Sequence, residues 1–513
     1  MKSGKNLLLS MSVLLLGLVM LGVQSSSQTA PDQSQDVLHS DQTLHANTRL
    51  VVVDVVATDN RGELISDLKP GDVTMLEDGK AQKISSFMFH PPGKTEVAIS
   101  SHLPANVVTN APAFQSSSLN VMLLDTLNGD FAEQSYVKDQ LLKYFSRAQL
   151  THPIAVFAME NHLVMLHDFT TDPTVLKSSV EKFKAPARFI NGETATSRAS
   201  AFTTFADSHS NERDIATTLN QLNALAKTLA GYPGRKNLIW LSEGFPLNLF
   251  PEITNRGPSG FTGRSVGQGP GTDSALGRGV MEGTGNGAFK DYAALVKKVS
   301  DALMTAQVAI YVVDAGAIGK DERMASHATM NDMAERTGGK AFIGTNDLAG
   351  SMRSSVDDGS TYYTLEYYPD NKKWDGQFRT IQLKSNRAGV KLRYRQGYYA
   401  LDPEKVNAAN SDAVAESFSR SLELDAPAAT QVVFQAQVQP PSEKTKKVVV
   451  TFHIDPGTLA FQHKEGGMES ARMSCTVWAY GKDKDKPTMS SGTVSANLKA
   501  GEYQQIMQQH FLP

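Results

Sequence analysis

The sequence contains a single cysteine, Cys475, and this scarcity limits how the protein can be stabilised. One thiol cannot form an intramolecular disulfide, so each domain has to be stable through its own hydrophobic core. Because Cys475 lies in the alternating apolar stretch 473–478, we expect a buried structural thiol there. The 513 residues, 40% of them hydrophobic, are enough for two or three domains with such cores.

Several functional signatures are also missing. The formal net charge is -3, so the sequence lacks the basic footprint of a nucleic-acid binder, and we expect no nucleic-acid partner. The Gly-rich runs 267–271 and 283–287 lack the Lys-Ser/Thr of a phosphate-binding loop, and no Gly-x-Ser-x-Gly elbow occurs. The sequence therefore assigns no catalytic residue.

The N-terminus has the order of a secretory signal peptide. Lys2 and Lys5 precede the apolar run Leu7–Val23, and small polar residues follow. We expect cleavage near Ser25 or Ala30 and export to the periplasm, the cell surface or the medium. The alternative is an uncleaved anchor, but the run is slightly shorter than the roughly 20 apolar residues that span a bilayer. No later run is long enough, so we expect no membrane span after signal removal.

Composition and periodicity divide the rest of the chain. The predicted segments are a signal peptide (1–25), a linker (26–47), a small β unit (48–91), a linker (92–117), an α/β domain (118–361), further β-strands (362–400), a helical connector (401–425) and a C-terminal β-sandwich-like domain (426–513). Because an isolated hairpin unit is marginally stable, we expect the first β unit to pair with strands from 362–399. The polar helical ending leaves open whether the C-terminal domain is complete.

Within 118–361, strand-like apolar runs alternate with helical patterns. This alternation predicts an α/β fold with a mostly parallel sheet and helices on both faces. The hairpin at 154–167 adds one antiparallel edge strand. Two inserts, 185–211 and 257–287, are longer than ordinary connections, and such loops are usually functional or irregular.

Polar residues follow the ends of several predicted strands in this domain. They occupy 125–130, 167–172, 242–244 and 314–316. Since ligands of open α/β sheets bind outside the carboxyl ends of the strands, we expect these residues to converge on one edge.

Six segments together resemble a known family. They are Val53–Asp59, Leu68–Asp72, Leu76–Lys80, Leu123–Asn128, Tyr232–Pro246 and Gln396–Tyr399. With the order of elements, they resemble von Willebrand factor A (VWFA) domains, and more closely a bacterial, acidobacterial-type VWFA-related family. The resemblance implies a von Willebrand factor A-like, Rossmann-like domain flanked by β-sandwich-like modules, and a role in binding a protein ligand.

The resemblance also implies a degenerate metal-ion-dependent adhesion site for Mg²⁺ or another divalent cation. Its candidate ligands are Asp125, Asn128, Thr170 and Glu243. Leu127 and Gly129 stand where the family has serines, so two side-chain oxygen ligands are lost, although Mg²⁺ requires oxygen ligands. The alternative is that no metal binds and that Asp125 and Glu243 cap loops and helix ends by hydrogen bonding.

We therefore interpret the chain as an exported VWFA-like protein that mediates protein binding or adhesion in the cell envelope. Two alternatives stay open. One is a metal-dependent hydrolase that uses the same acidic cluster, and the other is a structural component of the envelope.

Overall fold

The structure is a computed structural model that describes most of the chain outside its N-terminus and longest loops. It covers residues 50–91, 96–97, 103–112, 114–116, 118–127, 131–160, 162–184, 208–242, 288–316, 324–401, 427–441, 447–459, 461–464, 467–480 and 488–508. The predicted signal peptide, the linker that follows it, the insert 257–287 and almost all of the connector 401–425 lie outside these residues. So does the insert 185–211, apart from its last four residues, which begin a helix.

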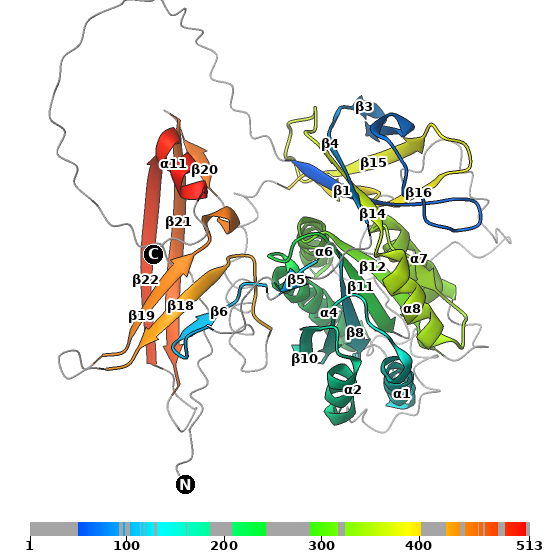
Figure 1. Ribbon diagram of the computed structural model, residues 1–513, viewed down its shortest axis with the longest axis horizontal. Helices are drawn as coiled ribbons and strands as arrows, with labels where there is room; N and C mark the ends of the chain where they lie inside the picture. The colour runs from blue at the N-terminus through cyan, green and yellow to red at the C-terminus, as the bar shows by residue number, and fades with distance from the viewer. Residues whose placement is uncertain are drawn as a thin grey trace, which may run out of the picture.

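A six-stranded sheet forms the centre of the α/β domain (Figure 1). Its strands are β8 (Ser118–Asp125), β9 (Ile154–Met159), β10 (Leu163–Thr170), β11 (Arg235–Ser242), β12 (Val308–Asp314) and β13 (Ala341–Phe342). The order is β10-β9-β8-β11-β12-β13, which is 3-2-1-4-5-6 when these strands are counted along the chain. This is the Rossmann-like order. All neighbours are parallel except the edge strand β10, which runs antiparallel to β9.

Helices cover both faces of this sheet. They are α1 (Phe131–Arg147), α2 (Pro173–Lys182), α4 (Ser208–Leu229), α6 (Ala288–Thr305), α7 (Met324–Arg336) and α8 (Leu348–Asp358). One core joins α4, α6 and α7 to one face, and a second joins α1, α2 and α8 to the other. Strands β8, β9, β11 and β12 are buried along their whole length, which explains the apolar runs in their sequences. The polar residues of β8 and β11 lie near the ends of these strands. The predicted fold class is confirmed.

A β-module of two four-stranded sheets packs beside the α/β domain. One sheet has the order β16-β1-β14-β4, and the other has the order β17-β15-β2-β3. The bounds are β1 (Val51–Thr58), β2 (Val73–Glu77), β3 (Lys80–Gln82), β4 (Ile84–His90), β14 (Tyr362–Tyr367), β15 (Phe378–Ser385), β16 (Lys391–Tyr394) and β17 (Gly397–Tyr399). Pairing of β1 and β4 with β14 joins segments about 300 residues apart, so the α/β domain is inserted within this module.

The C-terminal body contains two three-stranded sheets around one core. Its elements are β6 (Val107–Thr109), β18 (Phe434–Gln439), β19 (Val449–Ile454), β20 (Gln462–Lys464), β21 (Met468–Ala479), β22 (Thr488–Lys499) and α11 (Ala500–Met507). Cys475 is buried in this core, as the sequence predicted. Val107–Thr109, which we assigned to a linker, instead pairs with β18, and the short strands β5 (Glu96–Val97) and β7 (Phe114–Gln115) pair with each other.

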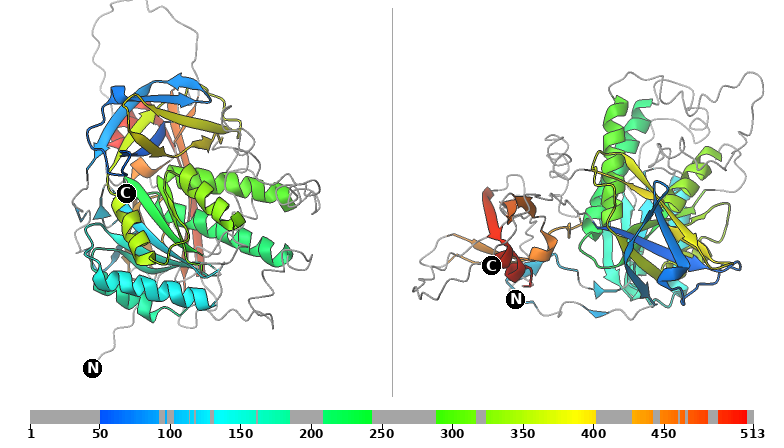
Figure 2. Two further views of the ribbon diagram at one scale, coloured as in Figure 1. Left: turned by 90° about the vertical axis from the view of Figure 1, so that its right-hand side faces the viewer. Right: turned by 90° about the horizontal axis from the view of Figure 1, so that it is seen from above.

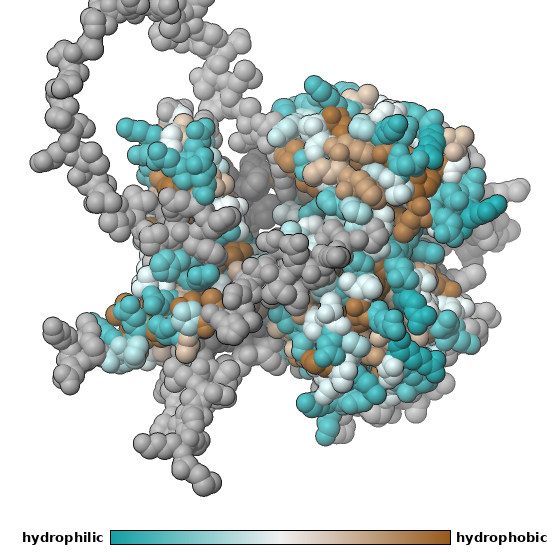
Figure 3. All heavy atoms as spheres, in the orientation of Figure 1, coloured by the Kyte–Doolittle hydropathy of each residue, from teal (hydrophilic) through white to brown (hydrophobic). Residues whose placement is uncertain are grey.

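The β-module and the α/β domain lie against each other, and the C-terminal body lies to one side of them, as the view from above shows (Figure 2, right). The β-module exposes the hydrophobic side chains of Leu50, Met88 and Phe89. Hydrophobic residues gather on the face of this module that is visible in Figure 3. Within the residues described above, no helix is both long enough and apolar enough to cross a membrane.

A buried carboxylate links the two sheets of the β-module. Glu77, on β2, is 3% exposed, and its Oε2 accepts hydrogen bonds from the hydroxyls of Tyr367 (2.6 Å) and Tyr398 (3.0 Å). Tyr367 belongs to one sheet, whereas Tyr398 and Glu77 belong to the other. Burial, followed by the neighbouring phenol and carboxylate, raises the pKa of Tyr367, and burial with Glu77 raises that of Tyr398.

We predict that Glu77→Ala lowers the free energy of unfolding by about 2–4 kcal/mol, because two buried hydroxyls lose their acceptor. Glu77→Gln, which keeps an acceptor oxygen, should cost less. Urea denaturation of both variants and of the exposed control Glu63→Ala checks this. Equal stability of Glu77→Ala and the control would contradict the assigned role.

Candidate functional site

Asp125 lies at the carboxyl end of β8, and hydrogen bonds from two segments hold its side chain in place. Its Oδ2 accepts from Ser242 Oγ (2.7 Å) and from Trp240 Nε1 (3.1 Å). Its Oδ1 accepts from the backbone N–H of Leu127 (3.0 Å). The side chain is 7% exposed. Two of these donors come from β11 and the third from the loop after β8, so Asp125 ties the two strand ends together.

A second polar pair lies at the same edge, at the end of the next strand. Asp314 ends β12 in register with Ser242 and is 3% exposed. Its Oδ1 accepts from the backbone N–H of Gly316 (3.0 Å), and its Oδ2 lies 3.0 Å from Nε2 of His327 on α7. The His327 side chain is 30% exposed, so the buried carboxylate orients a ring that solvent can reach. We call Asp125, Ser242, Asp314 and His327 the carboxyl-edge group.

Thr170 does not join this group. Asp125 is in register with Met159, whereas Thr170 is in register with Ile154, which itself lies opposite Asn120. Five residues of strand, about 16 Å, therefore separate Thr170 from the level of Asp125.

The physical reason is the direction of the edge strand. Because β10 runs antiparallel to the rest of the sheet, its carboxyl end lies beside the amino ends of the other strands. Our expectation that 167–172 converges with the other strand ends overlooked this reversal. The other two candidate ligands, Asn128 and Glu243, lie outside the described residues. Within those residues, no three His, Cys, Asp or Glu side chains lie close enough together to hold a metal ion.

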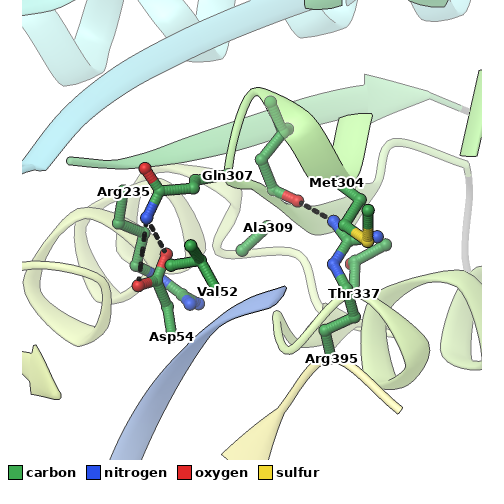
Figure 4. A pocket seen from close by; sticks show the side chains of 9 residues that line it. Val52, Asp54, Arg235, Met304, Gln307, Ala309, Thr337 and Arg395 are labelled. Carbon is green, nitrogen blue, oxygen red and sulfur yellow. Dashed lines mark hydrogen bonds between the residues drawn. The ribbon is translucent and has the colours of Figure 1, made fainter. Parts of the chain in front are cut away.

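A polar cluster that the sequence did not predict lies at the other end of the sheet. Asp54 comes from β1, Arg235 and Lys236 begin β11, Gln307 precedes β12, and Arg395 lies between β16 and β17. All but Gln307 come from, or directly adjoin, segments that carry the family resemblance. Arg235, Asp54, Gln307 and Arg395 line a pocket between the β-module and the α/β domain (Figure 4). We call these five residues the junction.

Hydrogen bonds across the junction join the two bodies directly. Arg395 Nη2 donates to the carbonyl of Val308 (3.0 Å), and the backbone N–H of Arg235 donates to the hydroxyl of Tyr362 (3.0 Å). Asp54 accepts from Gln307 Nε2 (3.3 Å) across the boundary, and from Thr364 Oγ1 (2.8 Å) within the β-module. The β-module is thus fixed to the amino ends of β11 and β12, at the end of the sheet opposite the carboxyl-edge group.

Burial perturbs the cations of the junction. Lys236 is 1% exposed and its Nζ donates to the carbonyl of Tyr232 (2.9 Å). Burial lowers the pKa of Lys236 to about 7, with Asp54 opposing the shift. Burial likewise lowers the pKa of Arg395 to about 10. The charged sequence pair Arg235-Lys236 at the start of an otherwise apolar strand was the signal that could have revealed the junction.

The shift of Lys236 predicts a pH dependence of stability. Its folded pKa of about 7 lies below the unfolded value of 10.5, so between these values the unfolded chain holds a proton that the folded chain lacks. Folding stability should therefore rise with pH from 7 to 9.5, by up to about 1.4 kcal/mol per unit. Lys236→Met should abolish this rise and stabilise the protein at pH 6, whereas the exposed control Lys391→Met should keep it. The free energy of unfolding is measured by denaturation at several pH values. If it changed with pH by the same amount in the wild type and in Lys236→Met, the assignment to Lys236 would be refuted.

Comparisons with known proteins give likeness to solved structures alone. No family model matches the sequence, and a search of curated proteins finds no match. The chain aligns with a von Willebrand factor type A protein from Catenulispora acidiphila at 12% identity, over 73% of this chain and 79% of that one, with a TM-score of 0.25. It aligns with the vWF domain of the type V pili tip protein Mfa5 from Porphyromonas gingivalis at 13% identity, over 47% of this chain and 95% of that one, with a TM-score of 0.25. It also aligns with the ArnB paralog VWA2 from Sulfolobus acidocaldarius at 10% identity, over 72% of this chain and 82% of that one, with a TM-score of 0.24. At these TM-scores the fold assignment rests on the chain's own strand order.

Proposed function

We propose that the chain is an exported, VWFA-like binding protein of the cell envelope and that its protein ligand docks at the carboxyl-edge group. One observation carries the proposal. Asp125 with Ser242, and Asp314 with His327, are held in fixed geometry at the ends of three neighbouring strands. This is the edge at which open α/β sheets bind ligands. The signal-like N-terminus supports the location in the envelope.

Pre-organisation is what suits this edge to binding. The carboxylates of Asp125 and Asp314 each accept hydrogen bonds from two separate elements, so they lose little conformational freedom when a ligand arrives. The ring of His327 is the most exposed part of the Asp314 pair and can donate or accept a hydrogen bond. A polar, rigid edge of this kind favours recognition of a protein surface with complementary hydrogen-bonding groups.

The proposed binding does not depend on a divalent cation. Both oxygens of Asp125 already accept hydrogen bonds from the protein, and Thr170 lies at the opposite edge of the sheet. These hydrogen bonds compete with Mg²⁺ for the carboxylate oxygens, and Thr170 is too far along the sheet to add its hydroxyl as a ligand.

Capture of the ligand from an envelope extract tests the docking site. His327→Ala should reduce the captured ligand about tenfold, which corresponds to roughly 1.4 kcal/mol, because a contact group at the edge is lost. Asp125→Ala should reduce it at least as much, because the strand ends lose their tie. Asp139→Ala, which removes an exposed carboxylate on α1, is the matched control. Capture that is unchanged in both edge variants, with folding verified by circular dichroism, would remove this edge from the proposal.

Metal titration gives a separate prediction. Addition of MgCl₂ or MnCl₂ should leave the melting temperature unchanged, and a chelator should leave ligand capture unchanged. A saturable rise in melting temperature that disappears in Asp125→Ala would instead demonstrate an adhesion-type metal site.

A further inference from the structure

Strand β22 has a free edge in the described part of the C-terminal body. It pairs with β21 over all twelve residues, from Thr488 to Lys499, without a register shift. Its sheet has the order β20-β21-β22, and no other described strand pairs with it. Figure 1 shows β21 and β22 running side by side along the length of this body. An edge strand of this kind presents a row of unpaired backbone N–H and C=O groups.

The sequence of β22 lacks the features that usually protect an edge. Natural edge strands are short, or carry charges, prolines or bulges that prevent pairing with another strand. From Thr488 to Leu498 the strand has no charged residue and no proline, and Lys499 at its end carries the only charge. Most of its side chains are Ser, Thr, Gly or Ala, which let a neighbouring backbone approach closely.

We propose that β22 pairs antiparallel with β22 of a second copy of this chain, so that two three-stranded sheets become one six-stranded sheet across a two-fold axis. Such an interface is isologous, since the same strand serves both copies. The pairing is independent of the ligand edge on the α/β domain and uses a different body of the molecule.

The strand is complementary to itself in register. Directly opposite residues of an antiparallel pair point to the same face. With the axis at Val494, Val494 lies opposite its own copy, and Gly492 lies opposite Ala496, on the face that carries the core residues Ala496 and Leu498. Ser491 then lies opposite Asn497, on the other face.

Charge favours a second copy over a different partner. In this register Lys499 lies opposite Met489, whose side chain is 57% exposed, and no like charges meet. A strand shaped for a different protein would gain specificity from charges complementary to that partner, and β22 has none before its last residue. A neutral strand that opposes no charge when paired with itself is what a self-pairing edge requires.

The test is the oligomeric state of the chain without its predicted signal peptide, measured by sedimentation velocity and light scattering at micromolar concentrations. We expect a dimer. Thr493→Lys should raise the dimer dissociation constant about tenfold or more, because it brings two like charges together beside the axis. Ser474→Lys is the matched control. Ser474 lies on β21, where it pairs with Thr493 of β22, so it is one strand away from the edge and its substitution should leave the dimer intact. A monomeric wild type, dimerisation of Thr493→Lys equal to wild type, or a monomer that takes up a different protein at this edge would each overturn the proposal.

A crosslinking experiment keeps the proposal testable if Thr493→Lys fails to fold. Ser491→Cys and Asn497→Cys chains, when mixed and oxidised, should form a disulfide between the two variants in high yield. Either variant alone should crosslink far less, because identical positions then do not face each other. Absence of the mixed disulfide in a folded sample would overturn the register and the pairing.

Discussion

The junction is the constraint on which the rest of the structure depends. Arg235, Lys236 and Arg395 are cations with almost no contact with solvent, and burial of such groups is costly unless hydrogen bonds compensate. Arg395 donates across the boundary to a carbonyl of the α/β domain, whereas Arg235 and Lys236 donate to carbonyls of their own domain. The β-module places the Tyr362 ring beside Arg235 and the carboxylate of Asp54 near Lys236, so the burial of these groups depends on both bodies. These contacts hold the inserted α/β domain in a fixed position relative to the β-module.

This arrangement separates two ends of one sheet. The amino ends of β11 and β12 are used for packing against the β-module, whereas their carboxyl ends carry Asp125, Ser242 and Asp314. The segments that resemble the VWFA-related family therefore serve two purposes. Asp125 contributes to the carboxyl edge, while Asp54 and the Arg235-Lys236 pair lie at the boundary with the β-module.

The sequence predicted the α/β fold well because buried parallel strands and amphipathic helices leave a strong periodic signal. Pairing of the first β segment with strands some 300 residues later followed from the marginal stability of an isolated hairpin unit. The site was harder to predict. Strand ends were identified, but the reversal of β10 moved Thr170 to the far edge, since a strand's sequence does not encode the end of the sheet at which it stops. His327 was missed because nothing local links a helical histidine to Asp314, and the junction was missed because Asp54 and Arg395 meet only through long-range pairing.

Hydrogen–deuterium exchange of the chain with and without its captured ligand distinguishes docking at the carboxyl-edge group from docking elsewhere. If the ligand docks at the carboxyl-edge group, protection from exchange appears at the carboxyl ends of β8, β11 and β12, in the segments 124–127, 241–242 and 314–316. The amino ends of β11 and β12 and the segment 167–172 should exchange at the same rate in both samples. Protection confined to those segments, with no change at the carboxyl ends, would rule out docking at the carboxyl-edge group.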